Sequence, residues 1–357
     1  MSVTTDAALR SGEKIRVTRS RRNVLWSSIG AVVVVVVLFV FPFYVASGTL
    51  GIMIQGLIVL TLASMWNLLA GYAGLVSVGQ QAFFGLGAYF VLIPATHGVS
   101  PWLGLPIAAV CAGASAFPLW WLLSRLRTGY FAIATWVMAS AIALFIEQIQ
   151  SIGGGTGMPL PGLTGYDPAV LTADTYWAAL GVAVLAMATV YFLLRSRLGL
   201  VLTAIRDDER AARSSGVKIG GARLLVFVVA AAGCGAAGGV LAINLLQVVP
   251  TTAGGVFSVQ WTAIMAFAAI IGGLGTIEGP IVGTAVYMVL QQTLQSHNAW
   301  YLIILGLVAI VVALFARRGL WGLVDEKLSI RLFPVGYFLW APGQTRRRQR
   351  NGPVSPR

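Results

Sequence analysis

Ten apolar segments, each close to the length that crosses a lipid bilayer, make up most of this chain of 357 residues. A membrane-spanning helix needs about 20 mostly apolar residues, because each residue rises only about 1.5 Å along the helix axis. The segments are 24–43, 50–70, 79–96, 101–123, 130–149, 176–194, 222–247, 258–274, 279–296 and 300–316. The sequence therefore predicts an all-α polytopic membrane protein with about ten transmembrane helices.

Composition excludes the main classes of soluble protein. Hydrophobic residues make up 58% of the chain and charged residues only 10%, whereas a typical soluble domain is about 25% charged. So few charges could not cover a core of this size in water, which excludes a cytoplasmic enzyme, a secreted disulfide scaffold and a disordered chain. Cys111 and Cys234 lie in separate apolar segments, where we expect both to be small, buried packing residues.

Positive charge is concentrated on one predicted side of the membrane. Of the 24 lysines and arginines, only nine lie between Val24 and Phe315, in short clusters at 125–127 and 195–223. A ten-helix topology with the N-terminus inside places every lysine and arginine on the cytoplasmic side, which is the usual distribution in membrane proteins. On that side the positive charge also attracts anionic lipid headgroups. The pattern predicts a multi-pass membrane protein with both termini cytoplasmic. We expect the positive charge to contact membrane lipid headgroups and not to bind nucleic acid.

The same topology divides the chain into three parts. These are a basic cytoplasmic N-terminal tail at 1–23, a transmembrane domain at 24–316 and a basic cytoplasmic C-terminal tail at 317–357. The first apolar run, 24–40, exceeds the 7–15 residues typical of a signal-peptide core, so we expect it to be a retained helix.

The outer loops carry neither an ATP-binding motif nor a metal-site pattern. In the longest, 150–175, the glycine-rich stretch 153–157 lacks the lysine and hydroxyl residue that end a phosphate-binding loop, and the full motif occurs nowhere in the chain. The histidines His97 and His297 fall in different outer loops, too far apart in sequence to indicate a metal site. We therefore expect no ATPase activity in this chain itself.

Glycine makes up 42 of the 357 residues and gathers at 71–87, 233–239 and 272–283. Small residues let transmembrane helices approach closely, and glycine also interrupts helices where backbone lines a polar pathway. For 233–239 we expect close packing. The other two stretches are expected to meet, and packing and a substrate pathway both stay open for them because they also carry polar side chains, namely Ser77, Gln80, Gln81, Thr276 and Glu278.

The long inner loop at 195–221 is predicted to contain a short amphiphilic helix at about 207–215. Asp207 and Asp208 suit a helix N-terminus, Glu209 and Arg213 have the i, i+4 spacing of an ion pair, and Gly216 suits the position after the helix. From these residues alone, the helix could be a solvated element that only maintains the topology.

The stretch AIRDDERAARSSGVKI (204–219) resembles the coupling loop of ABC importer permeases, in particular the LivM-type branched-chain amino-acid permease family. Four further stretches agree in order with that family and extend the resemblance over about residues 25–325. They are NLLAGYAGLVSVGQQAFFGLGAY (67–89), GYFAIATW (129–136), GGLGTIEGPIVGTA (272–285) and FARRGLWGL (315–323).

The resemblance implies a permease subunit of an ATP-driven importer in the bacterial cytoplasmic (inner) membrane, not an enzyme. Its partners would be a homologous LivH-type permease, two ABC ATPase subunits and an extracytoplasmic substrate-binding protein, with ATP bound by the partners and no cofactor, metal or catalytic residue in this chain. The substrate would be a branched-chain amino acid or a related small polar solute such as urea, an amide or an aromatic acid. The residues expected to couple to the ATPase are Ala204, Arg206, Asp207, Asp208, Glu209, Ala211, Ala212, Arg213 and Gly216.

Two departures from the family pattern leave the substrate open. Gln80-Gln81 stands where the family commonly has a small residue, and the outer loop has its glycines at 153–157 in a different arrangement.

Two other functions compete with this interpretation. A self-contained secondary transporter or channel should carry charged residues within the membrane for ion coupling, and the candidates are Glu147 and Glu278, each near a segment end, where we expect interfacial acids. A structural membrane scaffold would have no substrate-dependent partner.

Overall fold

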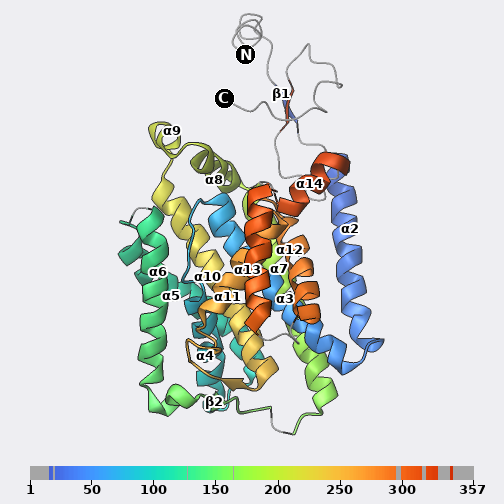
Figure 1. Cartoon of the computed structure of the whole chain (residues 1–357), viewed down its shortest axis with the longest axis vertical. Coiled ribbons are helices and arrows are strands. Elements are labelled where there is room, and N and C mark those ends of the chain that lie inside the picture. Colours follow the sequence, from blue (N-terminus) through green and yellow to red (C-terminus); the bar gives the residue numbers. More distant parts are fainter. Residues whose placement is uncertain are drawn as a thin grey trace, which may run out of the picture. The chain divides into compact units, whose positions relative to one another are not determined.

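The computed structural model describes residues 16–18, 21–126, 128–163, 165–294, 299–315, 319–328 and 338–340. Internal contacts divide the chain into a large unit, Val33–Arg331, and a small unit that combines Met1–Val32 with Leu332–Arg357. Each predicted apolar segment overlaps one long helix (Figure 1). These helices are α2 (Arg21–Val40), α3 (Ser47–Asn67), α4 (Gln81–Thr96), α5 (Pro101–Leu123), α6 (Thr128–Glu147), α7 (Pro168–Arg195), α10 (Ile219–Leu245), α11 (Val259–Gly272), α12 (Gly279–Leu294) and α13 (Ala299–Phe315).

Shorter elements connect these helices. Short turns of helix follow α2, α3 and α6. Strands β2 and β3 pair antiparallel over two residues, with Met158 opposite Val248. The connecting elements are η1 (Phe41–Phe43), η2 (Leu68–Tyr72), η3 (Gln150–Ile152), η4 (Gly154–Thr156), β2 (Met158–Pro159), α8 (Arg197–Asp207), α9 (Glu209–Ser214), β3 (Gln247–Val248) and α14 (Gly319–Leu328).

Among the described residues, five helices are long and apolar enough to cross a membrane. Three others are apolar but shorter, and α4 and α11 are two of them. Both lie beside an irregular stretch, because α4 follows 73–80 and α11 ends just before 273–278. The predicted number of ten crossings is therefore not established by helix length, although the multi-pass helical architecture is. The five helices are Gly48–Tyr72, Pro101–Leu123, Gly129–Glu147, Pro168–Arg195 and Ile219–Leu245.

Helices α3 and α10 form the centre of the large unit. Their most apolar windows are 67% buried, whereas those of α5 and α6 are 28% buried. Helix α10 packs against α3, α4, α5 and α7, and α3 also contacts α11 and α12. The outer faces of α5 and α6 expose large apolar side chains, including Phe117, Trp121, Val137 and Phe145, as expected of surfaces in contact with hydrocarbon or another membrane subunit.

Glycines in α10 let neighbouring helices approach closely. A Cβ atom on Gly235 would overlap Ala112 and the carbonyl of Ala108, and one on Gly238 would overlap the carbonyl of Phe84. The contacts join α10 to α5 and α4, so the predicted packing role of 233–239 is confirmed. Cys234 is fully buried in the same helix, as predicted, whereas Cys111 is partly exposed.

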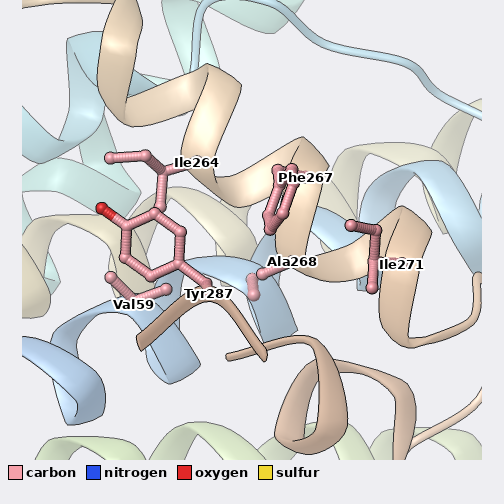
Figure 2. Close-up of a cluster of buried hydrophobic side chains, with 7 residues drawn as sticks. Val59, Ile264, Phe267, Ala268, Ile271 and Tyr287 are labelled. Atoms are coloured by element: carbon pink, nitrogen blue, oxygen red, sulfur yellow. The ribbon is translucent and has the colours of Figure 1, made fainter. Parts of the chain in front are cut away.

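A second apolar cluster joins α3, α11 and α12 (Figure 2). Figure 2 shows Tyr287 of α12 lying among Val59 of α3 and the side chains of α11. The rings of Phe267 and Tyr287 meet edge to face with their centroids 6.1 Å apart, a favourable geometry for aromatic pairs. This cluster holds α11 and α12 against α3 on both sides of the 273–278 interruption. Its members are Val59, Ala63, Ile264, Phe267, Ala268, Ile271 and Tyr287.

Residues from both predicted tails pair as a short sheet in the small unit. Strand β1 (Arg16–Thr18) runs antiparallel to β4 (Phe338–Trp340), with Val17 opposite Leu339. Part of the predicted C-terminal tail, α14, instead belongs to the large unit and contacts α11, α12 and α13. The sequence patterns predicted neither feature.

Candidate coupling and pathway site

The predicted coupling loop lies at one end of the large unit. Helices α8 and α9 lie together there, and β2, from the long loop between α6 and α7, lies at the opposite end (Figure 1). The two loops that the charge pattern assigned to opposite sides of the membrane are thus separated along the helix bundle.

The loop contains two helices, where the sequence predicted one. Asp207 is the last residue of α8, and Asp208 has an extended backbone (φ −155°) that separates α8 from α9. The Asp208 carboxylate accepts hydrogen bonds from the backbone N–H groups of Arg210 (2.8 Å) and Ala211 (3.1 Å). The predicted helix start at 207–208 is therefore wrong for Asp207 and confirmed for Asp208, which caps α9.

The rest of α8 explains why a second helix forms. The Ser196 side chain accepts the N–H of Leu198 at 3.2 Å and caps the start of α8. Leu202 and Ile205 are buried, while Ala204 and Arg206 are exposed, so α8 packs one apolar face on the bundle.

Two local predictions for α9 are confirmed. The Arg213 and Glu209 side chains form an ion pair at 3.1 Å, and both are substantially exposed. Gly216 has a left-handed backbone (φ +80°), which glycine adopts without steric cost. The N–H groups of Gly216 and Val217 return to the carbonyls of Arg213 (3.1 Å) and Ala212 (3.2 Å), closing the helix end.

The two alanines of α9 face different surroundings. Ala211 is exposed, whereas Ala212 is only 4% exposed and is covered by this chain itself. In this conformation Ala212 offers no side-chain surface to a partner, so of the two α9 alanines expected to couple to the ATPase only Ala211 is accessible. Beside it lies an open surface cavity of about 560 Å³, lined by Glu209, Arg210, Arg213 and Ser214.

Sequence reasoning missed that Arg223 ties α9 to the helix bundle. From the first turns of α10, its Nη2 donates to Glu209 Oε2 at 2.9 Å, and its Nε donates to the carbonyl of Ala73 at 3.4 Å. The Arg223 side chain is only 18% exposed. In the sequence, Arg223 lies 14 residues from Glu209, which matches no helical spacing. The sequence analysis therefore counted Arg223 only among the cytoplasmic cations.

The polypeptide leaves regular α-helix at two places that face each other. Helix α3 runs into the π-helical turn η2, and regular structure resumes only at Gln81. The second interruption, 273–278, separates α11 from α12. A Cβ on Gly71 would overlap the backbone N of Gly275, so the two glycine-rich stretches meet as expected.

Asn67, which the sequence did not single out, joins these two interruptions. Its Nδ2 donates to the carbonyl of Thr276 at 2.8 Å, and its Oδ1 accepts the N–H of Gly275 at 2.8 Å. The side chain is buried. One amide thus satisfies a donor and an acceptor of the second interruption, as a neighbouring backbone would.

Arg206 of α8 lies against the same segment. A Cβ on Gly275 would overlap its guanidinium, and Tyr72 lies within electrostatic reach of both Arg206 and Glu278. Arg206 and Arg223 therefore connect the coupling loop to both interruptions.

The predicted pathway residues are buried or partly buried and hydrogen-bonded within the chain. Gln80 Nε2 donates to Ser77 Oγ at 3.4 Å, and Thr262 of α11 donates to Gln81 Oε1. Thr276 Oγ1 donates to the Gly273 carbonyl at 2.8 Å and accepts the Gly279 N–H at 3.0 Å. These bonds give the side chains a structural role at the interruptions, and their contact with substrate stays a prediction.

The two acids considered for ion coupling differ in burial. Glu278 is 6% exposed and lies directly before α12, so it is buried within the chain, and its expected interfacial position stays a prediction. Glu147, the last residue of α6, is partly exposed, which suits an interfacial position.

Comparison with known proteins agrees with the motifs. Residues 48–313 match the family described as branched-chain amino acid transport system / permease component. The high-affinity branched-chain amino acid transport system permease protein LivM of Escherichia coli is 27% identical over 84% of this chain and 76% of its own length. Its Salmonella typhimurium counterpart is 26% identical over 83% and 75%.

A relative that matches over less of the chain carries a different substrate in its name. The putative glucose ABC transporter permease protein TsgC13 of Haloferax volcanii is 30% identical over 57% of this chain and 64% of its own length. No solved structure matches the chain. Because the family match covers most of the sequence, this multi-pass membrane protein belongs to the permease components of branched-chain amino acid ABC transport systems.

Proposed function

We propose that this chain is one of two permease subunits in an ATP-driven importer of the bacterial cytoplasmic membrane. It crosses the membrane ten times with both termini in the cytoplasm and works with a LivH-type permease, two ABC ATPases and an external substrate-binding protein. The chain itself performs no catalysis and holds no cofactor, because ATP is bound by the ATPases.

The observation that carries this proposal is the position of α9. It is a capped helix with exposed charges and an exposed Ala211 at one end of the bundle. Arg223 ties α9 to the first interruption, and Arg206 of the adjoining helix α8 lies against the second. An ATPase that presses on such a helix would change the geometry of the interruptions, where backbone outside regular helix suits a substrate pathway. Alternating access would follow from this movement.

The proposed substrate is a branched-chain amino acid, in keeping with the family and with the names of its enterobacterial relatives. The archaeal relative named for glucose shows that names within this group include another small polar solute. Urea, amides, aromatic acids and glucose are therefore the competitors to be tested.

A second candidate function is an ion-coupled secondary transporter. Its supporting observation is Glu278, since a buried acid in a membrane protein often serves ion or proton coupling. It would need no ATPase and would respond to an ion gradient.

Reconstituted vesicles separate the two candidates. The complete complex is expected to accumulate labelled leucine only with ATP inside and binding protein outside, and unlabelled competitors rank the substrates. Uptake driven by an ion gradient with this chain alone would instead support the secondary transporter.

A further inference from the structure

We propose that Arg223 is the residue through which movement of α9 reaches the interrupted helix after α3. This inference rests on the proposed ATPase coupling and deepens it, because it names the side chain that passes the movement on. Arg223 is a positioning residue in this role.

The guanidinium of Arg223 has one partner on each side of the link. Its Nη2 holds the Glu209 carboxylate of α9 at 2.9 Å, and its Nε reaches the carbonyl of Ala73 at 3.4 Å. Two different nitrogens make the two bonds, so a single planar group connects the loop helix to the buried end of η2. The planar guanidinium offers such a fixed pair of donors, which the single ammonium nitrogen of lysine does not.

The receiving end of the link is a place where the helix can change. Ala73 closes the π-helical turn at 68–72, and the chain then runs without regular structure to Gln81. Single π-turns within helices are frequent at functional sites. The carbonyl that Arg223 holds is one of those left without a helical partner at such an end, which makes the bond to Arg223 a determinant of the local conformation.

The second interruption is connected to the first by Asn67. The side-chain amide of Asn67 makes its two hydrogen bonds to Gly275 and Thr276, and Asn67 is the last residue of α3 before η2. A displacement of η2 therefore also shifts 273–278. Arg206 of α8 lies against Gly275 and so gives the coupling loop a second contact, this one with the 273–278 interruption.

The test uses the complete complex in vesicles, with Arg223→Lys as the main variant. Lysine keeps the positive charge and the topology, but its three N–H donors share one nitrogen, so it cannot reach Glu209 and Ala73 from two separate positions as Nη2 and Nε do. We expect the substrate moved per ATP hydrolysed to fall by about tenfold, within the usual range of coupling between sites. Lys218→Gln, which removes an exposed cation from the same loop, is the matched control and should stay near wild type.

Hydrogen exchange supplies a readout that a purely structural role would not change. In the wild-type complex, ATP binding should alter exchange of the amides in 73–80, and Arg223→Lys should abolish that response. If Arg223→Lys does not insert, Glu209→Gln, on the exposed side of the link, should abolish the same response.

The outcomes separate the two levels of the argument. A wild-type complex without ATP-dependent uptake contradicts the proposed function. A wild-type complex that transports, with an unchanged transport ratio and unchanged exchange response in Arg223→Lys or Glu209→Gln, overturns the role of Arg223 alone.

Discussion

The loop of α8 and α9 and the pair of helix interruptions beneath it are stabilised in opposite ways. In the loop, the Asp208 cap, the Glu209–Arg213 pair and the turn at Gly216 all join residues within five positions of each other. At the interruptions, Asn67 bonds residues more than 200 positions away. These loop contacts are local and mostly exposed, and each contributes little, whereas the contacts of Asn67 are long-range and each contributes more. The long-range bond from Arg223 to Glu209 is what joins the loop to the bundle.

The largest effect in this comparison is expected from Asn67→Ala. The substitution leaves the Gly275 N–H and the Thr276 carbonyl without the amide that pairs them. At about 1–3 kcal/mol for each of these two partly buried groups, the free energy of unfolding should fall by about 2–6 kcal/mol. Thermal unfolding in detergent measures this loss, with Thr189→Val on the exposed face of α7 as the control. Equal unfolding temperatures for Asn67→Ala and the wild type would contradict the stabilising role of the Asn67 side chain.

The next effect distinguishes the two alanines of α9. Ala212→Trp would overfill a buried position and should lower stability by about 1–3 kcal/mol. Ala211→Trp, on the exposed side, should leave thermal unfolding unchanged but prevent stimulation of ATP hydrolysis by the binding protein. The same two assays on both variants check the contrast, and identical behaviour of the variants would remove the distinction.

Loss of the cap should act locally. Asp208→Ala removes the acceptor for two N–H groups at the start of α9, and the loss of such a cap costs about 1 kcal/mol. Hydrogen exchange at Arg210 and Ala211 should accelerate while exchange in α10 stays the same. Faster exchange throughout α10 would show that the loop is not locally stabilised.

These differences explain what the sequence could predict. Helix α5 begins and ends where its apolar segment does, at 101 and 123, because span length and flanking turns are local properties. The Gly216 turn and the Glu209–Arg213 pair were likewise predicted from spacing. Asn67 and Arg223 could not be found this way, because their partners come close only when distant helices pack.

Two errors have equally physical causes. Both Asp207 and Asp208 suit a helix start by residue type, and only the backbone conformation shows that Asp208 caps α9 while Asp207 ends α8. Ala211 and Ala212 are adjacent and chemically identical, so their different burial depends on how α9 lies on the bundle.

The smallest effect is expected at the Glu209–Arg213 pair. Arg213 is highly exposed, and exposed pairs at i, i+4 contribute only about 0.3–0.5 kcal/mol. Arg213→Ala should therefore hardly change the unfolding temperature, and high salt should remove the remaining difference from wild type. A loss as large as that of Asn67→Ala would mean that α9 depends on this pair far more than its exposure indicates.

The central claim, that α9 faces the cytoplasm and receives an ATPase, is tested most directly by labelling one position. Cys111 and Cys234 are first replaced by alanine, and Ala211→Cys is treated with a membrane-impermeant maleimide from each side of sealed vesicles. We predict labelling only from the cytoplasmic side, and protection from labelling when the ATPase subunits are bound. Labelling from the external side, or equal labelling with and without the ATPases, would contradict the account.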